Sequence, residues 1–371
     1  MNIKSILVLL FLGLSLSAQA GRKVYNAVVD IKGHGDYRSV QAAIDAVPEQ
    51  NHNQYLIYIK AGTYREHVFI PLGKDHISLI GEGCDRVFIT DDKKSGGPNA
   101  IPVDKGATMV IHANDVTLQG ISIVNAYGVE AKDGPQALAL YAKGDRIALD
   151  HCGIMSYQDT YRTSEADNGR NYVSNSLILG AVDFIYGNGN AWFEHCTLKI
   201  NRKSGGWIVA PKHKPETRWG YVFNRCTITA DGKPQETTIW LGRPWHHQPQ
   251  TVFLNTHSEI NLPAEGWYPT MNGLPSVFAE YNTMDADGKP LDLSRRINRY
   301  YRLDEKKDTI WCTAKNILTA DEAAAYTVEQ IMGGDDHWNP AEIFDYSDKP
   351  VGFVIIDNKR RPVNRYGCFQ R

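Results

Sequence analysis

Apolar residues recur along this chain in short runs of the kind that form β-strands. From residue 55 to residue 260 the runs are rich in Val, Ile, Thr and Phe, Gly and Asn separate them, and helical periodicity is nearly absent. Short runs of β-branched and aromatic residues bounded by turn residues predict strands. Because no helical crossovers separate them, we expect repeating coils of short strands rather than a doubly wound α/β sheet.

Several of these runs look like copies of one unit. In the three clearest copies an apolar residue is followed by two polar residues, a cysteine, a small residue and an aliphatic residue, at 149–154, 193–198 and 223–228. Weaker copies lie around Ile121 and Ser176. The copies recur every 20 to 31 residues, a period typical of stacked supersecondary units. We therefore predict an all-β fold, a single-stranded parallel β-helix.

Three of the six cysteines hold the same place in successive copies. If the coils stack, Cys152, Cys196 and Cys226 should lie on top of one another in the interior, where a cysteine behaves as a small apolar residue. Six cysteines in an exported chain would also permit disulfides. Their spacing shows no close pairs, so we do not expect a zinc site.

Both ends of the predicted solenoid differ from its middle. Residues 37–46 place their apolar side chains on one helical face, and a short helix there would cap the open end of the core. Residues 319–332 also read as a helix, with Thr319 as N-cap and Glu322 three residues later. A polar tail with several basic residues follows from about residue 345. No Pro- or Ser-rich linker divides the chain, so we predict one domain over residues 21–371.

Four segments carry more polar residues than the wall of a solenoid needs. They are QALAL at residues 136–140, YQDT at 157–160, GAVDFIYGN at 180–188 and LGRPW at 241–245. The first three segments are about one coil apart, and the last lies two to three coils beyond the third. Stacking would therefore bring them side by side on one face of the solenoid.

Two aspartates in these segments suggest acid–base chemistry. Asp183 stands in an otherwise apolar run, so we expect partial desolvation to raise its pKa. Arg243 is its natural counterion, because a guanidinium on one carboxylate oxygen would keep Asp183 ionised and fix its rotamer. Asp159 lies 24 residues before Asp183, about one coil away. Two carboxylates that close push their pKa values apart, so one can be an anionic nucleophile and the other a protonated acid.

Three further side chains complete the candidate site. Gln136 and Gln158 carry side-chain amide donors suited to an oxyanion hole. Trp245 offers a flat face on which a sugar ring can stack. Each residue alone has an ordinary structural explanation, since a solenoid Asp often caps backbone amides and a Gln can join a buried amide ladder. Their combination at coil-compatible spacing favours a catalytic site.

Composition narrows the range of partners. The 371 residues include 40 basic and 42 acidic side chains, for a formal charge of −2, so no global positive field favours nucleic acid or an anionic membrane. The first twenty residues carry one charge, Lys4, then an apolar run over residues 6–16 and small residues around Ala18 and Ala20. This pattern is typical of a secretory signal peptide. We expect cleavage after Ala20 and a secreted or periplasmic protein.

The four polar segments resemble the signature motifs of the pectin methylesterase (pectinesterase) family, in its bacterial secreted form. LGRPW is intact at 241–245, QDT stands at 158–160, VDFI falls at 182–185, and a further GxYxE element is present as GTYRE at 62–66. The likeness runs from about residue 40 to about residue 340. It implies a right-handed parallel β-helix with a shallow cleft along its side. It also implies a carboxylic ester hydrolase that demethylates pectin to pectate and methanol.

The resemblance implies a role for each residue of the site. Asp183 matches the nucleophile, Asp159 the proton donor that later acts as a base, and Arg243 the arginine that holds the nucleophile. Gln158 and Gln136 match the oxyanion donors. The implied substrate contacts are Trp245, Thr108 and Tyr186. We expect no metal or other cofactor, the pectin polysaccharide homogalacturonan as the partner, and a monomer.

Two positions depart from the family pattern. Many relatives carry a Leu-Tyr pair after the QDT triplet, whereas Tyr161 and Arg162 follow it here. A cation at Arg162 near the cleft would favour pectin that is already partly de-esterified. Bacterial relatives often bridge a cysteine seven residues before the nucleophile to one thirteen residues after it. Those places hold Ser176 and Cys196, so we expect no disulfide there and a free thiol at Cys196.

Three other functions remain compatible with the sequence. A related esterase or thioesterase on the same scaffold would keep the site but take a different acyl ester. A β-helix pectin lyase would need acidic calcium ligands with a basic residue, and a pectin hydrolase would need two carboxylates spaced for a water molecule. Neither pattern stands out. A non-catalytic carbohydrate-binding solenoid has no need of paired carboxylates with amide donors.

Overall fold

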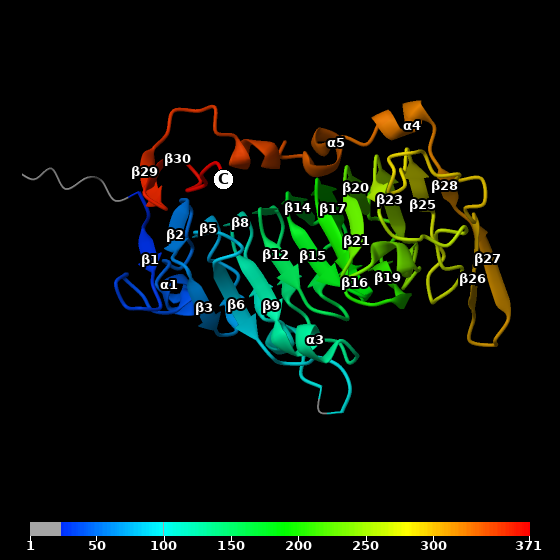
Figure 1. Ribbon diagram of the computed structural model, residues 1–371, viewed down its shortest axis with the longest axis horizontal. Coiled ribbons are helices and arrows are strands. Elements are labelled where there is room, and N and C mark those ends of the chain that lie inside the picture. The colour runs from blue at the N-terminus through cyan, green and yellow to red at the C-terminus, as the bar shows by residue number, and fades with distance from the viewer. Residues whose placement is uncertain (1–23, 99) are drawn as a thin grey trace, which may run out of the picture.

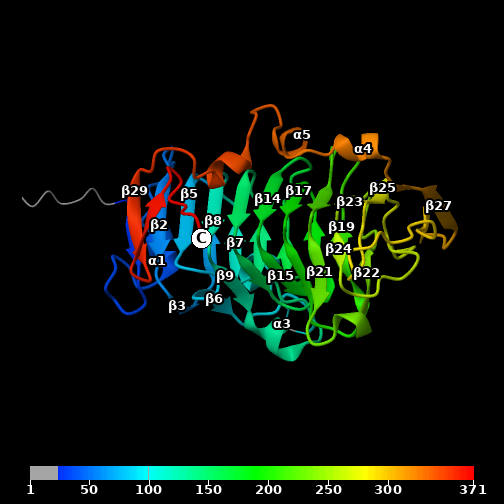
Figure 2. The ribbon, with the colours of Figure 1, turned by 45° about the horizontal axis from the view of Figure 1, so that its top comes forward.

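Three sheets of parallel strands form the walls of the molecule, wound as successive coils of one chain (Figures 1 and 2). The architecture is that of a computed structural model, which describes residues 24–98 and 100–371. The predicted signal peptide, residues 1–20, and its cleavage site lie outside the described residues. The parallel β-helix predicted from the repeats is confirmed.

Successive coils contribute strands to the three sheets in turn. The first sheet holds eleven strands: β1 (Ala27–Val29), β2 (Tyr55–Ile59), β5 (Ile77–Gly81), β8 (Val116–Gln119), β11 (Ile147–Asp150), β14 (Arg170–Ser174), β17 (Asn190–Glu194), β20 (Tyr221–Asn224), β23 (Gln250–Leu254), β25 (Val277–Tyr281) and β28 (Lys315–Ile317). The second sheet holds seven strands: β4 (Val68–Ile70), β7 (Met109–Ile111), β10 (Leu140–Ala142), β13 (Tyr161–Arg162), β16 (Val182–Gly187), β19 (Ser204–Pro211) and β22 (Thr238–Gly242). The third sheet holds eight strands: β3 (Gly62–Arg65), β6 (Val87–Asp91), β9 (Ser122–Asn125), β12 (Gly153–Met155), β15 (Leu177–Gly180), β18 (Thr197–Ile200), β21 (Thr227–Ala230) and β24 (His257–Ser258).

A tight turn between the first and third sheets explains part of the sequence repeat. One residue of this turn has a positive φ in coil after coil: 49° at His151, 47° at Asn175, 51° at His195, 52° at Arg225 and 50° at Asn255. This left-handed conformation is uncommon for residues other than Gly, Asn and Asp. It lets the chain bend from one sheet to the next within two residues, and the residue that follows is buried, as at Cys152, Cys196 and Cys226.

Equivalent positions of successive coils stack in the interior. Phe193 and Phe223 lie face to face with ring centroids 4.4 Å apart, and Phe253 stacks on Phe223 at 4.5 Å. The predicted interior cysteines are buried as expected: Cys152, Cys196 and Cys226. All six cysteines lie among the described residues and are free thiols, which confirms the prediction that Cys196 has no disulfide partner.

The predicted capping helix at the N-terminal end is confirmed. It is α1 (Val40–Asp45), and the Ser39 hydroxyl accepts a hydrogen bond from the amide of Ala42 at 3.2 Å. A serine at this place satisfies one of the amides that a helix start leaves unpaired. Ala43 and Ile44 are fully buried and join the same core as the strands.

The single helix predicted over residues 319–332 is wrong, because the segment forms two short helices, α4 (Ala320–Ala324) and α5 (Val328–Met332). The predicted capping box of Thr319 and Glu322 is present at the start of α4. A second cap breaks the segment, since Thr327 has an extended backbone and its hydroxyl accepts from the amide of Gln330 at 3.2 Å.

The remaining elements are short. They are α2 (Val103–Gly106), α3 (Ala126–Ala131), two 3₁₀ turns (Pro234–Glu236 and Pro340–Phe344), and two antiparallel hairpins formed by β26 (Arg299–Leu303) with β27 (Thr309–Thr313) and by β29 (Gly352–Ile356) with β30 (Lys359–Val363). No helix in the described ranges is long and apolar enough to span a bilayer.

A C-terminal strap, residues 318–371, folds back along the first sheet to the N-terminal end of the solenoid (Figures 1 and 2). Apolar side chains of the strap pack on that sheet in two clusters. One includes Trp192 and Val222 from the coils with Ile331 from the strap, and the other includes Tyr58 with Phe369. The residues after 345, expected to form a polar tail, thus contribute to a packed interface. The strap covers the outer face of the first sheet.

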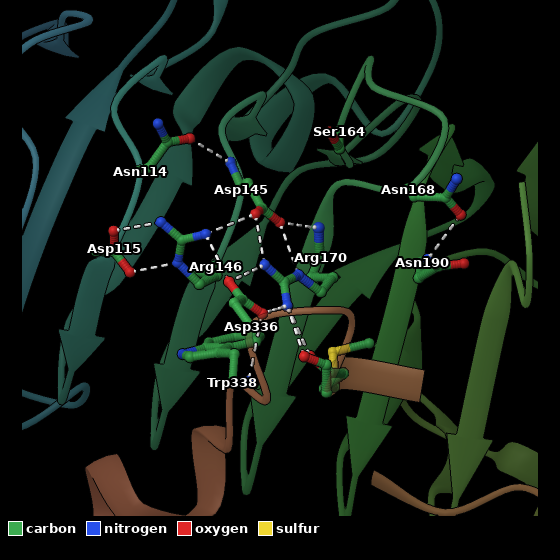
Figure 3. Close-up of polar contacts among 12 residues, drawn as sticks. Asn114, Asp115, Asp145, Arg146, Ser164, Asn168, Arg170, Asn190, Asp336 and Trp338 are labelled. Carbon is green, nitrogen blue, oxygen red and sulfur yellow. Dashed lines mark hydrogen bonds and ion pairs between the residues drawn. The ribbon is translucent and has the colours of Figure 1, made fainter. Parts of the chain in front are cut away.

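A mostly buried arginine ties the strap to the coils (Figure 3). Arg170, at the start of β14, donates to Asp145 at 2.7 Å and to Asp336 of the strap at 2.8 Å, both from Nη2. Its Nη1 also donates to the main-chain carbonyl of Met332 at 3.0 Å. The hydrogen bonds and charge of Arg170 hold the pKa of Asp336 well below its usual range, although burial opposes them.

We predict that replacing Arg170 by Met lowers the free energy of unfolding by about 2–4 kcal/mol, because two carboxylates lose a buried partner. Urea unfolding of the variant and the parent protein measures this change. Lys289→Met is the matched control, since Lys289 and Asp287 form an exposed pair worth about 1 kcal/mol or less. If the two variants unfold at the same urea concentration, apolar packing alone holds the strap.

We also predict that a thiol reagent modifies Cys84 and Cys312 of the native protein first, because both are partly exposed and the other four cysteines are buried. All six thiols should react in denaturant without a reductant. Mass spectrometry of labelled peptides gives the extent of reaction at each position. Fewer than six reactive thiols in the denatured protein would reveal a disulfide and contradict the structure.

Candidate active site

The predicted site residues gather on the outer face of the second sheet, where β10, β13, β16, β19 and β22 are neighbours. This face, unlike that of the first sheet, is not covered by the strap. Its apolar lining is Phe69, Val103, Ala107, Val110, Leu138, Tyr141, Tyr186, Ala210 and Trp245. A separate cavity of about 680 Å³ lies next to α5, and none of the predicted site residues lines it.

Asp159 and Asp183 occupy neighbouring coils. Gln158 and Val182 form a parallel bridge, and the amide of Asp159 donates to the carbonyl of Val182 at 3.0 Å. The spacing of 24 residues between the two aspartates is therefore one coil, as the repeat predicted. Both aspartates have a positive φ, 60° at Asp159 and 49° at Asp183. Aspartate is one of the few residue types that adopt this left-handed conformation readily.

A β-bulge directs Asp183 to the outer face. The pairing of β16 with β19 shifts register between Val182 and Ile185, and an extra residue of this kind bends the strand and re-aims a side chain. Phe184 packs into the core with no exposed surface. Asp183, the residue before it, instead meets an arginine on the outer face. An apolar strand thus presents one carboxylate outward without opening the core.

Arg243 holds Asp183 at two points. Its Nε donates to Oδ1 of Asp183 at 2.9 Å and its Nη2 to Oδ2 at 2.5 Å. The amide of Arg243 is itself anchored, because it donates to the carbonyl of Val209 in β19 at 3.0 Å. A bidentate guanidinium fixes both the position and the plane of a carboxylate. The predicted pairing of these two side chains is present.

Trp207 supports the arginine, and sequence reasoning missed it. The guanidinium carbon of Arg243 lies 3.6 Å from the centroid of a Trp207 ring, close enough for a cation–π contact. The edge of Tyr268 in turn meets Trp207, with ring centroids 5.4 Å apart. Trp207 pairs with Val182 across β19 and β16, one coil after the strand that holds Asp183. Its 24-residue distance from Asp183 was the signal that would have found it.

Burial and charge set different protonation states for the two aspartates. Burial raises the pKa of Asp183, and the hydrogen bonds and charge of Arg243 oppose that rise. Burial, and then the negative charge of Asp183, raise the pKa of Asp159 well above its usual range. The charges of Arg162 and Arg243 and the hydroxyl of Tyr186 only partly offset this. The pKa of Asp159 is thus raised more strongly than that of Asp183, which is the direction that a general acid beside an ionised nucleophile would need.

Gln136 and Gln158 lie in consecutive coils beside the aspartates. The amide of Ala137 donates to the carbonyl of Gln158 at 3.2 Å, and Gln158 adjoins Val182. Across the described ranges neither side-chain amide has a protein hydrogen-bond partner, so both can donate to a bound group. Gly96 lets a loop close over Gln136, because a Cβ there would lie 1.7 Å from Oε1 of Gln136.

The three predicted substrate contacts differ in their exposure. Trp245 is partly exposed, and its ring meets Tyr186 edge-on with centroids 5.6 Å apart. Tyr186 is nearly buried and lies beside Asp159. Thr108 is fully buried, and its hydroxyl donates to the carbonyl of Val124 at 3.1 Å. A side chain held inward in this way does not reach the outer face, so we leave Thr108 out of the site.

A metal centre is not evident in the described part of the chain. Across residues 24–98 and 100–371, no three His, Cys, Asp or Glu side chains lie close enough together to hold a metal ion. Activity without a metal or another cofactor stays a prediction. The groups that are assembled are two carboxylates with differently shifted pKa values, an arginine and two amides, which is a set suited to acyl transfer.

Sequence comparisons point to one family. The family model described as Pectinesterase matches residues 26–335. Probable pectinesterase A of Neosartorya fischeri is 32% identical over 310 residues, which are 78% of this chain and 90% of that protein. The pectinesterase of Petunia integrifolia is 28% identical over 84% of this chain and 81% of that protein.

Solved structures agree with the sequence comparisons. Pectin methylesterase from carrot has a TM-score of 0.73 and 27% identity, covering 87% of this chain and 97% of that chain. A pectin methylesterase solved in complex with a hexasaccharide shares the fold, with a TM-score of 0.64 and 23% identity over 85% of this chain. Pectinesterases are carboxylic ester hydrolases. With a family model matched over most of its length and a relative at 32% identity, the chain belongs to the pectinesterase family, as its motifs predicted.

Proposed function

We propose that the chain hydrolyses the methyl esters of pectin, leaving pectate and releasing methanol, by a double displacement at Asp183. The observation that carries the proposal is the two-point hold of Arg243 on Asp183, next to Asp159, whose pKa is raised well above its usual range. An ionised carboxylate in a fixed orientation can act as a nucleophile. A neighbouring carboxylic acid can protonate the alcohol that leaves.

The first half-reaction forms an acyl-enzyme. An oxygen of Asp183 attacks the carbonyl carbon of a galacturonate methyl ester, while the amides of Gln136 and Gln158 donate to the oxygen that becomes negative. The bond to the methoxy oxygen breaks, and Asp159 gives its proton to that oxygen, so methanol departs. An anhydride then joins Asp183 to the galacturonate carboxyl group, and Asp159 is ionised.

The second half-reaction restores the enzyme. Asp159 takes a proton from water as the water oxygen attacks the galacturonate carbon of the anhydride. The bond to Asp183 breaks, which returns an ionised carboxylate to Arg243, and the new carboxylic acid loses its proton to solvent. One ester and one water have become one acid and one methanol. No step uses a group from outside the site.

Two features support a polysaccharide as the substrate. The partly exposed ring of Trp245 on an uncovered sheet face offers a platform for a sugar ring. One fold neighbour, a pectin methylesterase, was solved with a bound hexasaccharide. A related esterase or thioesterase acting on another acyl ester would use the same side chains. Methanol release from pectin separates that alternative from the proposal.

We also propose that the protein acts outside the cytoplasm, either secreted or in the periplasm. The signal-peptide pattern of residues 1–20 supports this location. The expected monomeric state, and the expected absence of nucleic-acid, membrane and cofactor partners, stay predictions.

Replacing Asp183 by Asn should lower methanol release from pectin by roughly 10³-fold or more, because a carboxamide is too weak a nucleophile. The fold should survive, since the side chains have the same shape. Initial rates of methanol formation and far-UV circular dichroism check both statements. Asp231→Asn is the matched control, because Asp231 pairs with Lys199 just after β21, on the third sheet. Substantial esterase activity in Asp183→Asn would refute the mechanism.

Replacing Arg243 by Met should move the acid limb of the kcat/KM profile to higher pH. Arg243 keeps the pKa of Asp183 below the value that burial alone would give, so its loss raises that pKa and protonates the nucleophile over a wider range of low pH. Arg243→Lys retains a charge and should shift the limb less. The limbs of the pH profile report apparent pKa values that belong to the coupled pair of aspartates. An unmoved acid limb in Arg243→Met would contradict this role.

A further inference from the structure

The outer face that holds the candidate active site does not end at β22. The segment 266–270 lies along that strand, because the amide of Tyr268 donates to the carbonyl of Gly242 at 2.9 Å. Next comes β26, since Thr270 and Tyr301 form a parallel bridge. The antiparallel partner of β26 is β27. This hairpin thus lengthens the second sheet at the C-terminal end of the solenoid (Figure 1).

One face of the β26–β27 hairpin packs on the core, and the other face is open to solvent. Tyr300 of β26 is fully buried, and its ring meets that of Phe278 edge-on with centroids 5.6 Å apart. Side chains alternate along a strand, so Tyr301 points away from the core. Trp311 is the cross-strand partner of Tyr301 and is 51% exposed. The hairpin therefore presents an aromatic pair on its outer face.

Aromatic rings link this pair to the candidate active site. Trp207, which supports the arginine of that site, meets Tyr268 edge-on, and Trp240 of β22 meets Tyr268 as well, with ring centroids 5.5 Å apart. Tyr268 stands two residues before Thr270, so the two share one face, and Thr270 bridges Tyr301. A row of rings on successive strands therefore runs along the outer face from Trp207 to the hairpin.

An arginine is held against the exposed aromatic pair. The guanidinium carbon of Arg299 lies 4.7 Å from the ring centroid of Trp311, and the centroids of Tyr301 and Trp311 are 5.0 Å apart. Within the described ranges the Arg299 side chain has no ion-pair or hydrogen-bond partner, so its five N–H donors are available to a ligand. The acidic residues of the hairpin stand in its turn, at the opposite end of β26 from Arg299: Asp304, Glu305 and Asp308.

The exposed pair and its arginine match the chemistry of the polymer expected at the active site. A galacturonan chain offers sugar rings that stack on aromatic faces, and carboxyl groups that pair with a guanidinium. Single exposed aromatic side chains are ordinary on protein surfaces, but this pair shares one sheet face with Asp183. The hairpin strand β27 lies five strand spacings from β16, about 24 Å away at the usual spacing of parallel strands. Only a substrate of several sugar units can reach both places.

We propose that the β26–β27 hairpin is a second binding site for pectin, which holds a distant part of the polymer whose ester lies at Asp183. Trp311 and Tyr301 stack on a sugar ring, and Arg299 donates to its carboxyl or hydroxyl oxygens. The proposal rests on the proposed function, because its ligand is the proposed substrate. The hairpin does not touch the reacting ester. It therefore raises the affinity for long chains, as a second linked contact does, and leaves the chemical step unchanged.

The first test compares methanol release from long pectin and from a methyl-esterified trigalacturonate, which is too short to span both sites. Replacing Trp311 by Ala should raise the KM for pectin by about threefold to tenfold and leave kcat unchanged, because the lost contact binds ground state and transition state equally. The kcat/KM for the trigalacturonate should equal that of the parent protein. Trp311→Phe keeps a ring and should return the KM for pectin to within about twofold of the parent value.

The second test measures binding without turnover, as retardation in native gels that contain polygalacturonate, relative to gels without it. Trp311→Ala and Arg299→Gln should each be retarded less than the parent protein, and Arg299→Gln covers the case in which the alanine variant does not fold. Phe353→Ala is the matched control. Phe353 of the β29–β30 hairpin is 44% exposed and has Arg360 at 3.7 Å from its ring centroid. That hairpin lies at the other end of the molecule (Figures 1 and 2), so this variant should be retarded like the parent.

The outcomes separate the second site from the function. Parent-like retardation and KM in both Trp311→Ala and Arg299→Gln would overturn the second site, while methanol release would leave the proposed function standing. An equal loss of activity on the trigalacturonate, or an equal loss of binding in Phe353→Ala, would also overturn it. So would a dimer that only Trp311→Ala dissociates, with unchanged binding, because the hairpin would then join two copies of the chain. No methanol from pectin with the parent protein would refute the proposed function itself.

Discussion

The stacking of one coil on the next is the constraint on which the rest of the molecule depends. Parallel strands lie about 4.8 Å apart, so residues at equivalent places in consecutive coils are neighbours although 20 to 30 positions separate them in the chain. This register puts Asp159 beside Asp183, Arg162 beside Tyr186 and phenylalanine on phenylalanine in the core. The candidate active site is one such set of stacked neighbours, on the outer face of a sheet.

The same spacing brings the carboxylates of Asp159 and Asp183 close enough to repel each other when both are ionised. Two carboxylates one coil apart, one buried and one half-buried, cannot easily be ionised together. Arg243 resolves the competition in favour of Asp183, because it binds both oxygens of that group and stacks on Trp207. The roles that we propose for the two aspartates, nucleophile for Asp183 and acid for Asp159, follow from which carboxylate has the two-point hold.

The outer faces of the first and second sheets have different roles in the molecule. The strap packs apolar side chains on the outer face of the first sheet and is fastened by Arg170 through Asp145 and Asp336. The second sheet is not covered by the strap and carries the candidate catalytic groups, aromatic rings and cations. A long polymer needs such an extended face. Its lining places the rings of Tyr141, Tyr186 and Trp245 next to the cations Arg162 and Lys212.

The sequence by itself determined the solenoid, its capping helix and the grouping of the four motifs. These depend on local signals with a common period: a turn residue, an inward residue and an apolar strand in each coil. Contacts between segments that share no sequence repeat were decided only by the tertiary structure. Arg170 and Asp336 are 166 residues apart, and Thr108 turns inward to a main-chain carbonyl. Their positions follow from packing between segments whose patterns are unrelated, which no repeat in the chain records.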